Sequence, residues 1–305
     1  MTHTEVSYTS LSDIIRALWQ NKWKVSIGTL IGAIFGVVIA FSLTEMYRSQ
    51  AVLAPASNNS SGGLGALAGQ LGGIASIAGV DLGGQEQNHT ALAIEIMNSH
   101  KFLSDFIIKH QLAVPLFAYT GYDYQSSQPE IDASIYDTQT KTWYREPDAL
   151  GNQAPNEFDL VKEFRKQIDI SEDNATGFVT IQFYNPSPEV ANLVVNQLIA
   201  TVNETVRMRD MEQAQKSIAY LESELAKTSI FEMRKVFNQL VEEQTKALML
   251  SKVKTDYVFD IIDPAYTTLK PERPNKPVIV IAMFLLGFLL MLTYVLVFKL
   301  PKLKA

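Results

Sequence analysis

The chain has 305 residues, a net charge of −6 and no cysteine. A chain of this length forms one or two domains, and its mildly acidic charge argues against a general nucleic-acid binder. Without cysteine the protein can have no disulfide, no thiol nucleophile and no cysteine-type zinc site.

The first 24 residues are expected to be a cytoplasmic N-terminus that carries a short amphipathic helix, beginning at about Leu11. Ser10 and Asp13 can cap it, and Lys22, Trp23 and Lys24 are residues typical of a membrane interface. We expect the helix to lie on the inner membrane surface, with packing against protein as the alternative. Its apolar residues recur at helical spacing: Leu11, Ile14, Ile15, Leu18 and Trp19.

Residues 25–43 are predicted to form the first transmembrane helix. They contain no charge and would span about 28 Å as a helix. A cleaved signal peptide fits poorly, because the apolar run is long and no small-x-small cleavage site precedes Glu45. Gly28, Gly32 and Gly36 share one face and predict close packing on another helix, although small residues are also simply common in membrane spans.

Residues 44–276 are predicted to form a periplasmic domain of α+β class. Residues 57–84 hold nine of the 16 glycines and read as a close-packed or partner-facing loop. Residues 118–157 are expected to be irregular with short elements. The remaining predicted elements of the base are a strand over 48–53, helices over 88–111 and 158–167, and a hairpin formed by 168–172 and 177–184.

A helical protrusion is predicted over about residues 187–254. One long helix starts at Pro186 and Pro188, and the apolar phase slips at Ser229, where the chain must turn back. Apolar side chains in the first arm follow a 3-4 spacing of coiled-coil type: Met211, Ala214, Ile218, Leu221 and Leu225. We expect Ile218, Leu221 and Leu225 to pack neighbouring copies together. The returning arm carries a new stripe of Met233, Phe237, Leu240 and Ala247.

The chain is predicted to re-enter the membrane through a strand, a linker and a second span. The strand covers 257–262 and is expected to end at Pro264. Pro271, Pro274 and Pro277, three residues apart, predict a stiff polyproline II linker over 271–277. Residues 278–298 are uncharged and form the second transmembrane helix. Both the N-terminal flank and the tail 299–305 are lysine-rich, which places both in the cytoplasm.

No catalytic signature accompanies these elements. The chain has no H-E-x-x-H, G-x-S-x-G or phosphate-loop motif, and the four histidines (3, 89, 100 and 110) lack metal-ligand spacing. Carboxylate pairs such as Glu242 and Glu243 are adjacent on a helix, so they do not face a common point. We therefore expect no enzymatic activity, no cofactor and no metal.

The chain resembles the Wzz-type chain length determinants, the bacterial polysaccharide co-polymerases. The resemblance implies an inner-membrane protein with an α+β base and a long helical protrusion in the periplasm. It also implies a homo-oligomeric ring that sets the length of polysaccharide made from lipid-linked precursors by a Wzy-type polymerase, as in O-antigen synthesis. The segments that carry it are 11–23, 214–228, 242–250 and 256–265, followed by the three prolines beside the second span.

Three other functions fit parts of the pattern. A co-polymerase that works in exopolysaccharide export with a tyrosine kinase on a separate chain stays open, since the tail to Ala305 holds no ATP-binding domain. A periplasmic sensory protein would need a cytoplasmic output module after the second span. A tethered glycan enzyme would need a cleft with perturbed acids, and the sequence offers no candidate pair.

Overall fold

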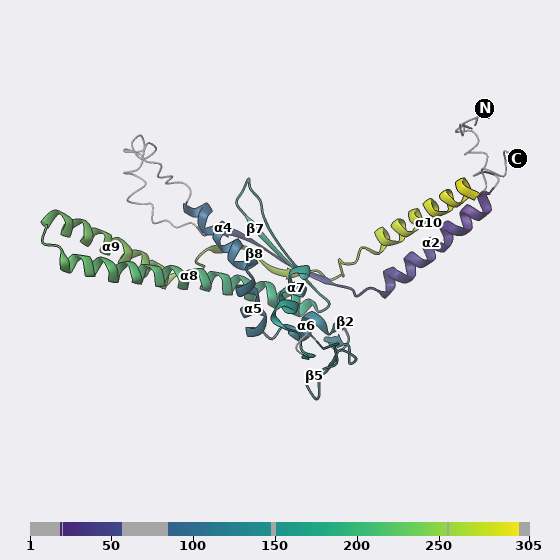
Figure 1. Ribbon diagram of the computed structural model, residues 1–305, viewed down its shortest axis with the longest axis horizontal. Coiled ribbons are helices and arrows are strands. Elements are labelled where there is room, and N and C mark those ends of the chain that lie inside the picture. The colour runs from purple at the N-terminus through teal and green to yellow at the C-terminus, as the bar shows by residue number, and fades with distance from the viewer. Residues whose placement is uncertain (1–18, 20, 57–84, 148–150, 255, 299–305) are drawn as a thin grey trace, which may run out of the picture. The chain divides into compact units, whose positions relative to one another are not determined.

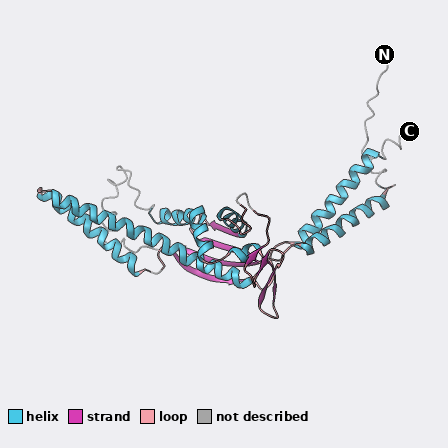
Figure 2. Ribbon diagram, turned by 60° about the horizontal axis from the view of Figure 1, so that its bottom comes forward, coloured by secondary structure: helices cyan, strands magenta, loops and turns pink. Residues whose placement is uncertain are grey.

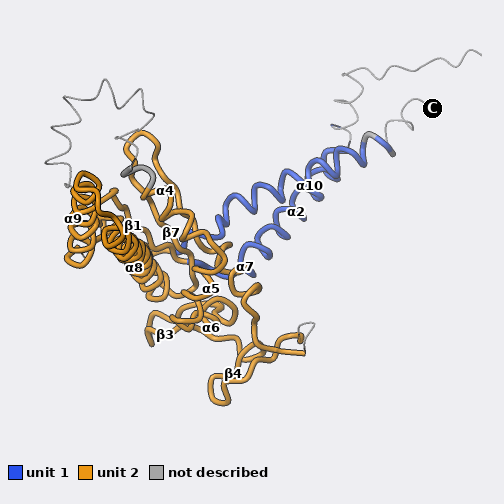
Figure 3. Tube along the Cα trace, turned by 60° about the vertical axis from the view of Figure 1, so that its left-hand side comes forward, with its two compact units in different colours: residues 1–46, 271–305 blue, residues 47–270 orange. Residues whose placement is uncertain are grey.

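The computed structural model describes residues 19, 21–56, 85–147, 151–254 and 256–298. The chain divides into two compact units, drawn in two colours in Figure 3. One comprises residues 1–46 and 271–305, and the other residues 47–270. The predicted N-terminal helix before residue 19, the glycine-rich segment 57–84 and the tail 299–305 lie outside the described residues.

The unit formed by residues 47–270 is of the α+β class, as the sequence predicts. Its main sheet is antiparallel, with strand order β6-β7-β1-β8. Ile181 pairs with Ile170 on one side and with Ala51 on the other. The hairpin predicted over 168–184 and the strand predicted over 48–53 are therefore confirmed. The strands are β1 (Tyr47–Pro55), β6 (Ile168–Glu172), β7 (Val179–Asn185) and β8 (Phe259–Thr267).

The sheet is covered on one face. Buried and partly exposed residues alternate along β1, as expected for an antiparallel strand with one solvated side. Helix α8 (Pro188–Lys227) lies across the buried face, as Figure 2 shows. Its first half supplies a buried stripe to the core: Ala191, Val194, Val195, Leu198, Ile199, Val202 and Val206.

Shorter helices complete this layer. They are α4 (Gln85–Asn98), α5 (His100–Lys109), α6 (Ala113–Phe117) and α7 (Glu157–Gln167). The ring of Phe164 of α7 lies between those of Phe106 of α5, which it meets edge-to-face at a centroid distance of 5.9 Å, and Phe183 of β7, at 5.1 Å. The predicted single helix over 88–111 is wrong, because Ser99 interrupts it and its hydroxyl caps α5 by accepting a hydrogen bond from the Phe102 amide.

Residues 118–147 form two small hairpins, in keeping with the short elements expected there. The first pairs β2 (Tyr119–Asp123) with β3 (Gln128–Ile131), and the second pairs β4 (Tyr136–Asp137) with β5 (Thr142–Trp143). Aromatic contacts hold the hairpins together, and the rings of Tyr136 and Trp143 lie 4.8 Å apart.

The long α8 ends at Lys227, and α9 (Phe231–Val253) runs back along it (Figure 1). The break expected near Ser229 is therefore confirmed. The four residues of the returning stripe differ in burial. Phe237 is half-buried, as are Val241 and Leu248, and Ser251 is buried, whereas Met233, Leu240 and Ala247 are exposed.

Strand β8 is longer than predicted. Pro264 does not end it, since pairing with β1 continues to Thr267, which lies opposite Ser49. Strand β8 is at the edge of the sheet and pairs only with β1, whose register shifts around Val52. A proline, which has no backbone N–H, is tolerated at such an edge position.

A buried amide joins α8 to the start of β8. The Asn203 side chain is 4% exposed. Its Oδ1 accepts hydrogen bonds from the amides of Val258 and Phe259 at 2.9 and 3.0 Å, and its Nδ2 donates to the Phe259 carbonyl at 3.2 Å. One side chain thus satisfies three backbone groups of a strand end that is itself buried.

Replacing Asn203 with Ala is expected to destabilise the protein by about 2–4 kcal/mol, because the buried backbone groups would lose their partners. Asn196→Ala is the matched control on the same helix, since that side chain is exposed and bonds only to Asn192. Urea unfolding of the full-length protein in detergent, followed by circular dichroism, measures both. Equal midpoints for the two variants would contradict the role given to Asn203.

Candidate functional site

The unit formed by residues 1–46 and 271–305 contains two long apolar helices. They are α2 (Lys22–Ser42) and α10 (Lys276–Phe298), and both are long and apolar enough to cross a membrane. They pack on each other, and the glycines of α2 lie in the contact. A Cβ atom on Gly32 would come within 2.7 Å of the Met283 carbonyl oxygen, and one on Gly36 within 3.1 Å of the Val280 Cα.

A glycine of α10 that sequence reasoning missed completes this contact. A Cβ atom on Gly287 would lie 3.0 Å from the Gly28 carbonyl oxygen and 3.2 Å from the Gly32 Cα. Such distances are tighter than ordinary side-chain contacts, so a Cβ at Gly287 would push the two backbones apart by a few tenths of an ångström. The sequence could have indicated this contact, because Gly287 is the single glycine in residues 278–298.

The two chain segments at the ends of these helices are tied together. The Met46 amide donates to the Arg273 carbonyl at 2.8 Å, and the Glu272 amide donates to the Met46 carbonyl at 2.9 Å. Lys276 at the start of α10 pairs with Glu45, and its ammonium group lies over the Phe41 ring at 4.4 Å. The ammonium group of Lys276 and the carboxylate of Glu45 thus lie side by side where the two apolar helices meet the rest of the chain.

The prolines of the linker do not form one polyproline II segment. Pro277 is already in the first turn of α10, a position where proline costs no hydrogen bond. Pro271 and Pro274 flank residues that pair with Met46. The backbone at Glu272 and Arg273 is therefore held by hydrogen bonds to Met46 as well as by the neighbouring prolines, which a pattern of prolines alone does not reveal.

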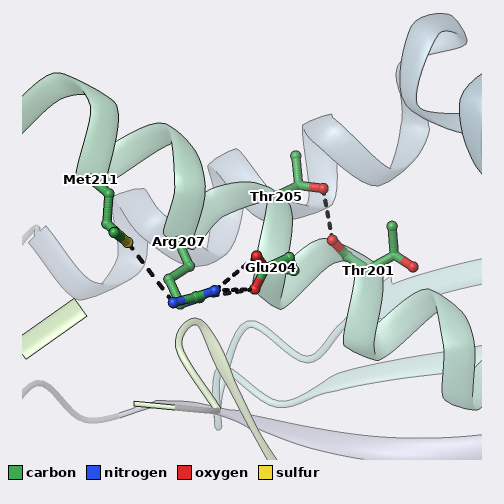
Figure 4. A network of polar contacts seen from close by, with 5 residues as sticks. All are labelled: Thr201, Glu204, Thr205, Arg207 and Met211. Carbon is green, nitrogen blue, oxygen red and sulfur yellow. Dashed lines mark hydrogen bonds and ion pairs between the residues drawn. The ribbon is translucent and has the colours of Figure 1, made fainter. Parts of the chain in front are cut away.

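The middle of α8 carries a polar network between the core and the protrusion (Figure 4). Arg207 donates to both carboxylate oxygens of Glu204 at 2.6 and 2.8 Å, and its other terminal nitrogen lies 3.8 Å from the Met211 sulfur. The Thr205 hydroxyl donates to the Thr201 carbonyl at 2.7 Å. These contacts lie within one helix, so they support helix continuity rather than a ligand site.

Beyond Met211 the predicted seam faces α9. Ile218, Leu221 and Leu225 are half-buried, whereas most of their neighbours on α8 are exposed. The three residues therefore have an apolar partner within the same chain, and their predicted role between copies stays a prediction.

A second polar cluster joins the base of the hairpin. The Tyr257 hydroxyl donates to Asp210 at 2.9 Å and lies 3.1 Å from the Ser251 hydroxyl. His89 of α4 approaches the same carboxylate at 3.7 Å. Burial, aided by the Asp210 carboxylate, raises the pKa of Tyr257, so the phenol stays protonated as a donor. The cluster ties three helices to the chain before β8.

The described residues offer no group of three or more His, Asp and Glu side chains able to hold a metal ion. The charged pairs of the protrusion, such as Glu212 with Lys216, are exposed and lie one helical turn apart. The α2–α10 contact brings together helices from the two ends of the described chain. It can position two helices closely, but it presents no reactive group.

Gly32→Leu is expected to separate α2 from α10, because a large side chain in a close-packed contact costs about 1–3 kcal/mol or more. Ser26→Leu is the control, since Ser26 is exposed on the same helix. Titration of the full-length protein with SDS in mixed micelles should give a lower midpoint for Gly32→Leu only. Identical midpoints would show that the close approach contributes nothing to stability.

Comparisons with known proteins point to one family. Residues 8–110 match the model of the family described as Wzz, chain length determinant protein. No curated protein matches the chain in sequence. A solved structure described as a full-length bacterial polysaccharide co-polymerase aligns over 94% of this chain and 96% of its own length, with 14% identity and a TM-score of 0.35.

The family match covers the first span, β1, α4 and α5, and it lies in the N-terminal part of the chain. The structural alignment is too distant to add to it. The resemblance seen in the sequence is thereby confirmed: residues 8–110 of this chain are similar to the Wzz chain length determinant family.

Proposed function

We propose that this protein is a non-enzymatic regulator of polysaccharide chain length in the bacterial inner membrane. The observation that carries the proposal is the Wzz family match over residues 8–110. Two apolar helices in the same unit, one from each end of the chain, support a protein that crosses the membrane twice. Regulation would act on O-antigen or a related surface polysaccharide.

The proposed topology places both termini in the cytoplasm and residues 44–276 in the periplasm. Lysines follow the positive-inside rule at both ends: Lys22 and Lys24 precede the first span, and Lys299, Lys302 and Lys304 follow the second. Lys270, Arg273 and Lys276 lie on the other side of the second span. They belong to a long translocated segment, for which the rule weakens, and Lys276 is neutralised by Glu45.

The proposed mechanism is positional rather than chemical. A homo-oligomeric ring of this chain would hold a Wzy-type polymerase and its lipid-linked product together, and so determine how long the polymer grows. The close α2–α10 contact supports this role, because tightly packed spans give a membrane partner a defined surface. In this mechanism the protein positions its partners and catalyses no reaction itself.

Deletion of the gene should broaden the length distribution of the surface polysaccharide, and the full-length chain supplied in trans should restore a narrow mode. Gel electrophoresis of the polysaccharide shows the distribution, beside a blot for protein level in the membrane. An unchanged ladder after deletion would exclude chain-length control.

Reporter fusions after residues 5 and 302 are expected to indicate the cytoplasm, and a fusion after residue 150 the periplasm. The physical reason is the lysine bias at both ends of the chain. A pair of reporters active in opposite compartments provides the measurement. A cytoplasmic signal from residue 150 would contradict the proposed topology.

A further inference from the structure

An apolar stripe runs along one side of α9. Met233, Val236, Leu240 and Leu250 are 43%, 47%, 39% and 43% exposed, and Ala247 between them is exposed as well. We call these five residues the α9 stripe. They follow the 3-4 spacing of a coiled-coil seam, with a glutamate at the one remaining position. Aligned apolar side chains of this kind mark an interaction site, and the surroundings of the stripe indicate its partner.

The stripe faces the side of the α8–α9 hairpin on which α4 lies. Residues of an α-helix are about 100° apart, so Ser251 lies between the stripe and the face that packs on α8, about 45° from the centre of each. The Tyr257 hydroxyl lies 3.1 Å from the Ser251 hydroxyl and donates to Asp210 of α8 at 2.9 Å. His89, near the start of α4, approaches the same carboxylate at 3.7 Å. Tyr257 and the first turns of α4 therefore lie on the side of the stripe, and Figure 1 shows α4 next to α8.

The segment 57–84 leaves and re-enters the described chain at this place. Before it, the Ala56 amide donates to the Val258 carbonyl at 2.8 Å, directly after the tyrosine that contacts both helices. After it, α4 begins at Gln85, about one turn before its contact with α8. Both anchoring points thus lie at the Leu250 end of the stripe.

The segment is long enough to cover the whole stripe. Met233 and Leu250 are about 26 Å apart along a helix. A segment of about 28 residues that leaves and returns can extend about 45 Å from its ends, at about 3.3 Å per residue. Because both ends are fixed beside the stripe, the effective concentration of the segment there is high. A contact within one chain is therefore favoured over capture of another molecule.

The segment has the composition that such a surface requires. No residue from Ser57 to Val80 is charged. Large apolar residues recur in it at 3-4 spacing, as they do in the α9 stripe, and the glycines and alanines between them permit a close approach to a helix. The apolar residues with this spacing are Leu64, Leu67, Leu71 and Ile74.

We propose that residues 64–74 cover the α9 stripe of their own chain. The two apolar surfaces then remove each other from water. The hairpin gains a third apolar layer that is joined at both ends to the base, so the base holds α9 as well as α8. The contact goes beyond chain-length control and does not depend on it, since one chain alone forms it.

Thiol labelling tests this cover, because the chain has no cysteine of its own. Ala247→Cys places a thiol in the middle of the stripe with little change in size. In the full-length protein in detergent, its reaction with a maleimide should be slow. Leu67→Asp together with Leu71→Asp should speed the reaction about tenfold or more, because an apolar contact does not tolerate unpaired charges. Equal rates with and without the aspartates would overturn the proposal.

Asn238→Cys provides the matched control. Asn238 is exposed on α9 and lies about 175° around the helix from the centre of the stripe. Its thiol should react fast whether or not the two aspartates are present. Equal acceleration at Asn238→Cys and Ala247→Cys would show that the aspartates loosen α9 as a whole, and would contradict a contact confined to the stripe.

Disulfide formation distinguishes cover by the same chain from cover by a second copy. Ala247→Cys is combined in one chain with Leu67→Cys or Leu71→Cys. Oxidation should link at least one pair within the monomer, since the bond requires Cα atoms about 4.4–6.8 Å apart, and peptide mass spectrometry identifies the link. Differently tagged copies that carry one cysteine each should stay monomeric on a denaturing gel. Dimers from these copies, without a link inside the chain, would show that a second copy covers the stripe and would overturn the assignment.

Discussion

The antiparallel pairing of β1 with β8 is the constraint on which the other elements depend. These strands are the first and last of the unit formed by residues 47–270, and each leads within a few residues to one of the apolar helices. The pairing of Ser49 with Thr267 brings the two ends of residues 49–267 side by side. The chain between them must therefore leave the sheet and return to it at neighbouring strands. The Met46–Arg273 bridge continues the same side-by-side arrangement beyond the strands.

Helix α8 passes through two environments, and its side chains change accordingly. Up to Val206 it has a sheet and shorter helices on one side, and a wide stripe of valine, leucine and isoleucine is buried there. Beyond Met211 its main neighbour among the described elements is α9. A narrow seam is enough for one neighbour, and the remaining apolar residues of the hairpin stay exposed. Each large apolar side chain that is fully buried contributes about 1.5–3 kcal/mol, which explains why the base, where α8 buries a wide stripe, holds the core.

Much of this fold follows from periodicity in the sequence. The alternation along 48–53 and 168–184 indicates strands, and the phase slip at Ser229 indicates the turn, because both patterns depend on local geometry. The remaining features of the fold depend on contacts between segments far apart in the chain, or on side-chain caps, which hydrophobic periodicity does not identify. Strand β8 continues through Pro264 because it lies at the sheet edge, and Ser99 divides a periodic segment because its hydroxyl caps a new helix. The glycines of α2 were evident, but their partner Gly287 becomes significant only once α10 is placed beside them.

The same reasoning explains why the apolar residues of the returning stripe do not all face α8. Met233, Phe237, Leu240 and Ala247 form an apolar face by spacing, yet two overlapping faces of α9 are apolar, and only Phe237 belongs to the one that meets α8. A helix with one neighbour in its own chain does not need two such faces. The second face has no neighbour among the described residues, so its apolar side chains remain exposed. In α2 and α10, which are long and apolar enough to cross a membrane, the opposite holds: bulky residues are exposed and glycines form the contact between the helices. Burial of large apolar side chains organises the unit formed by residues 47–270, whereas close backbone approach at glycines organises the α2–α10 pair.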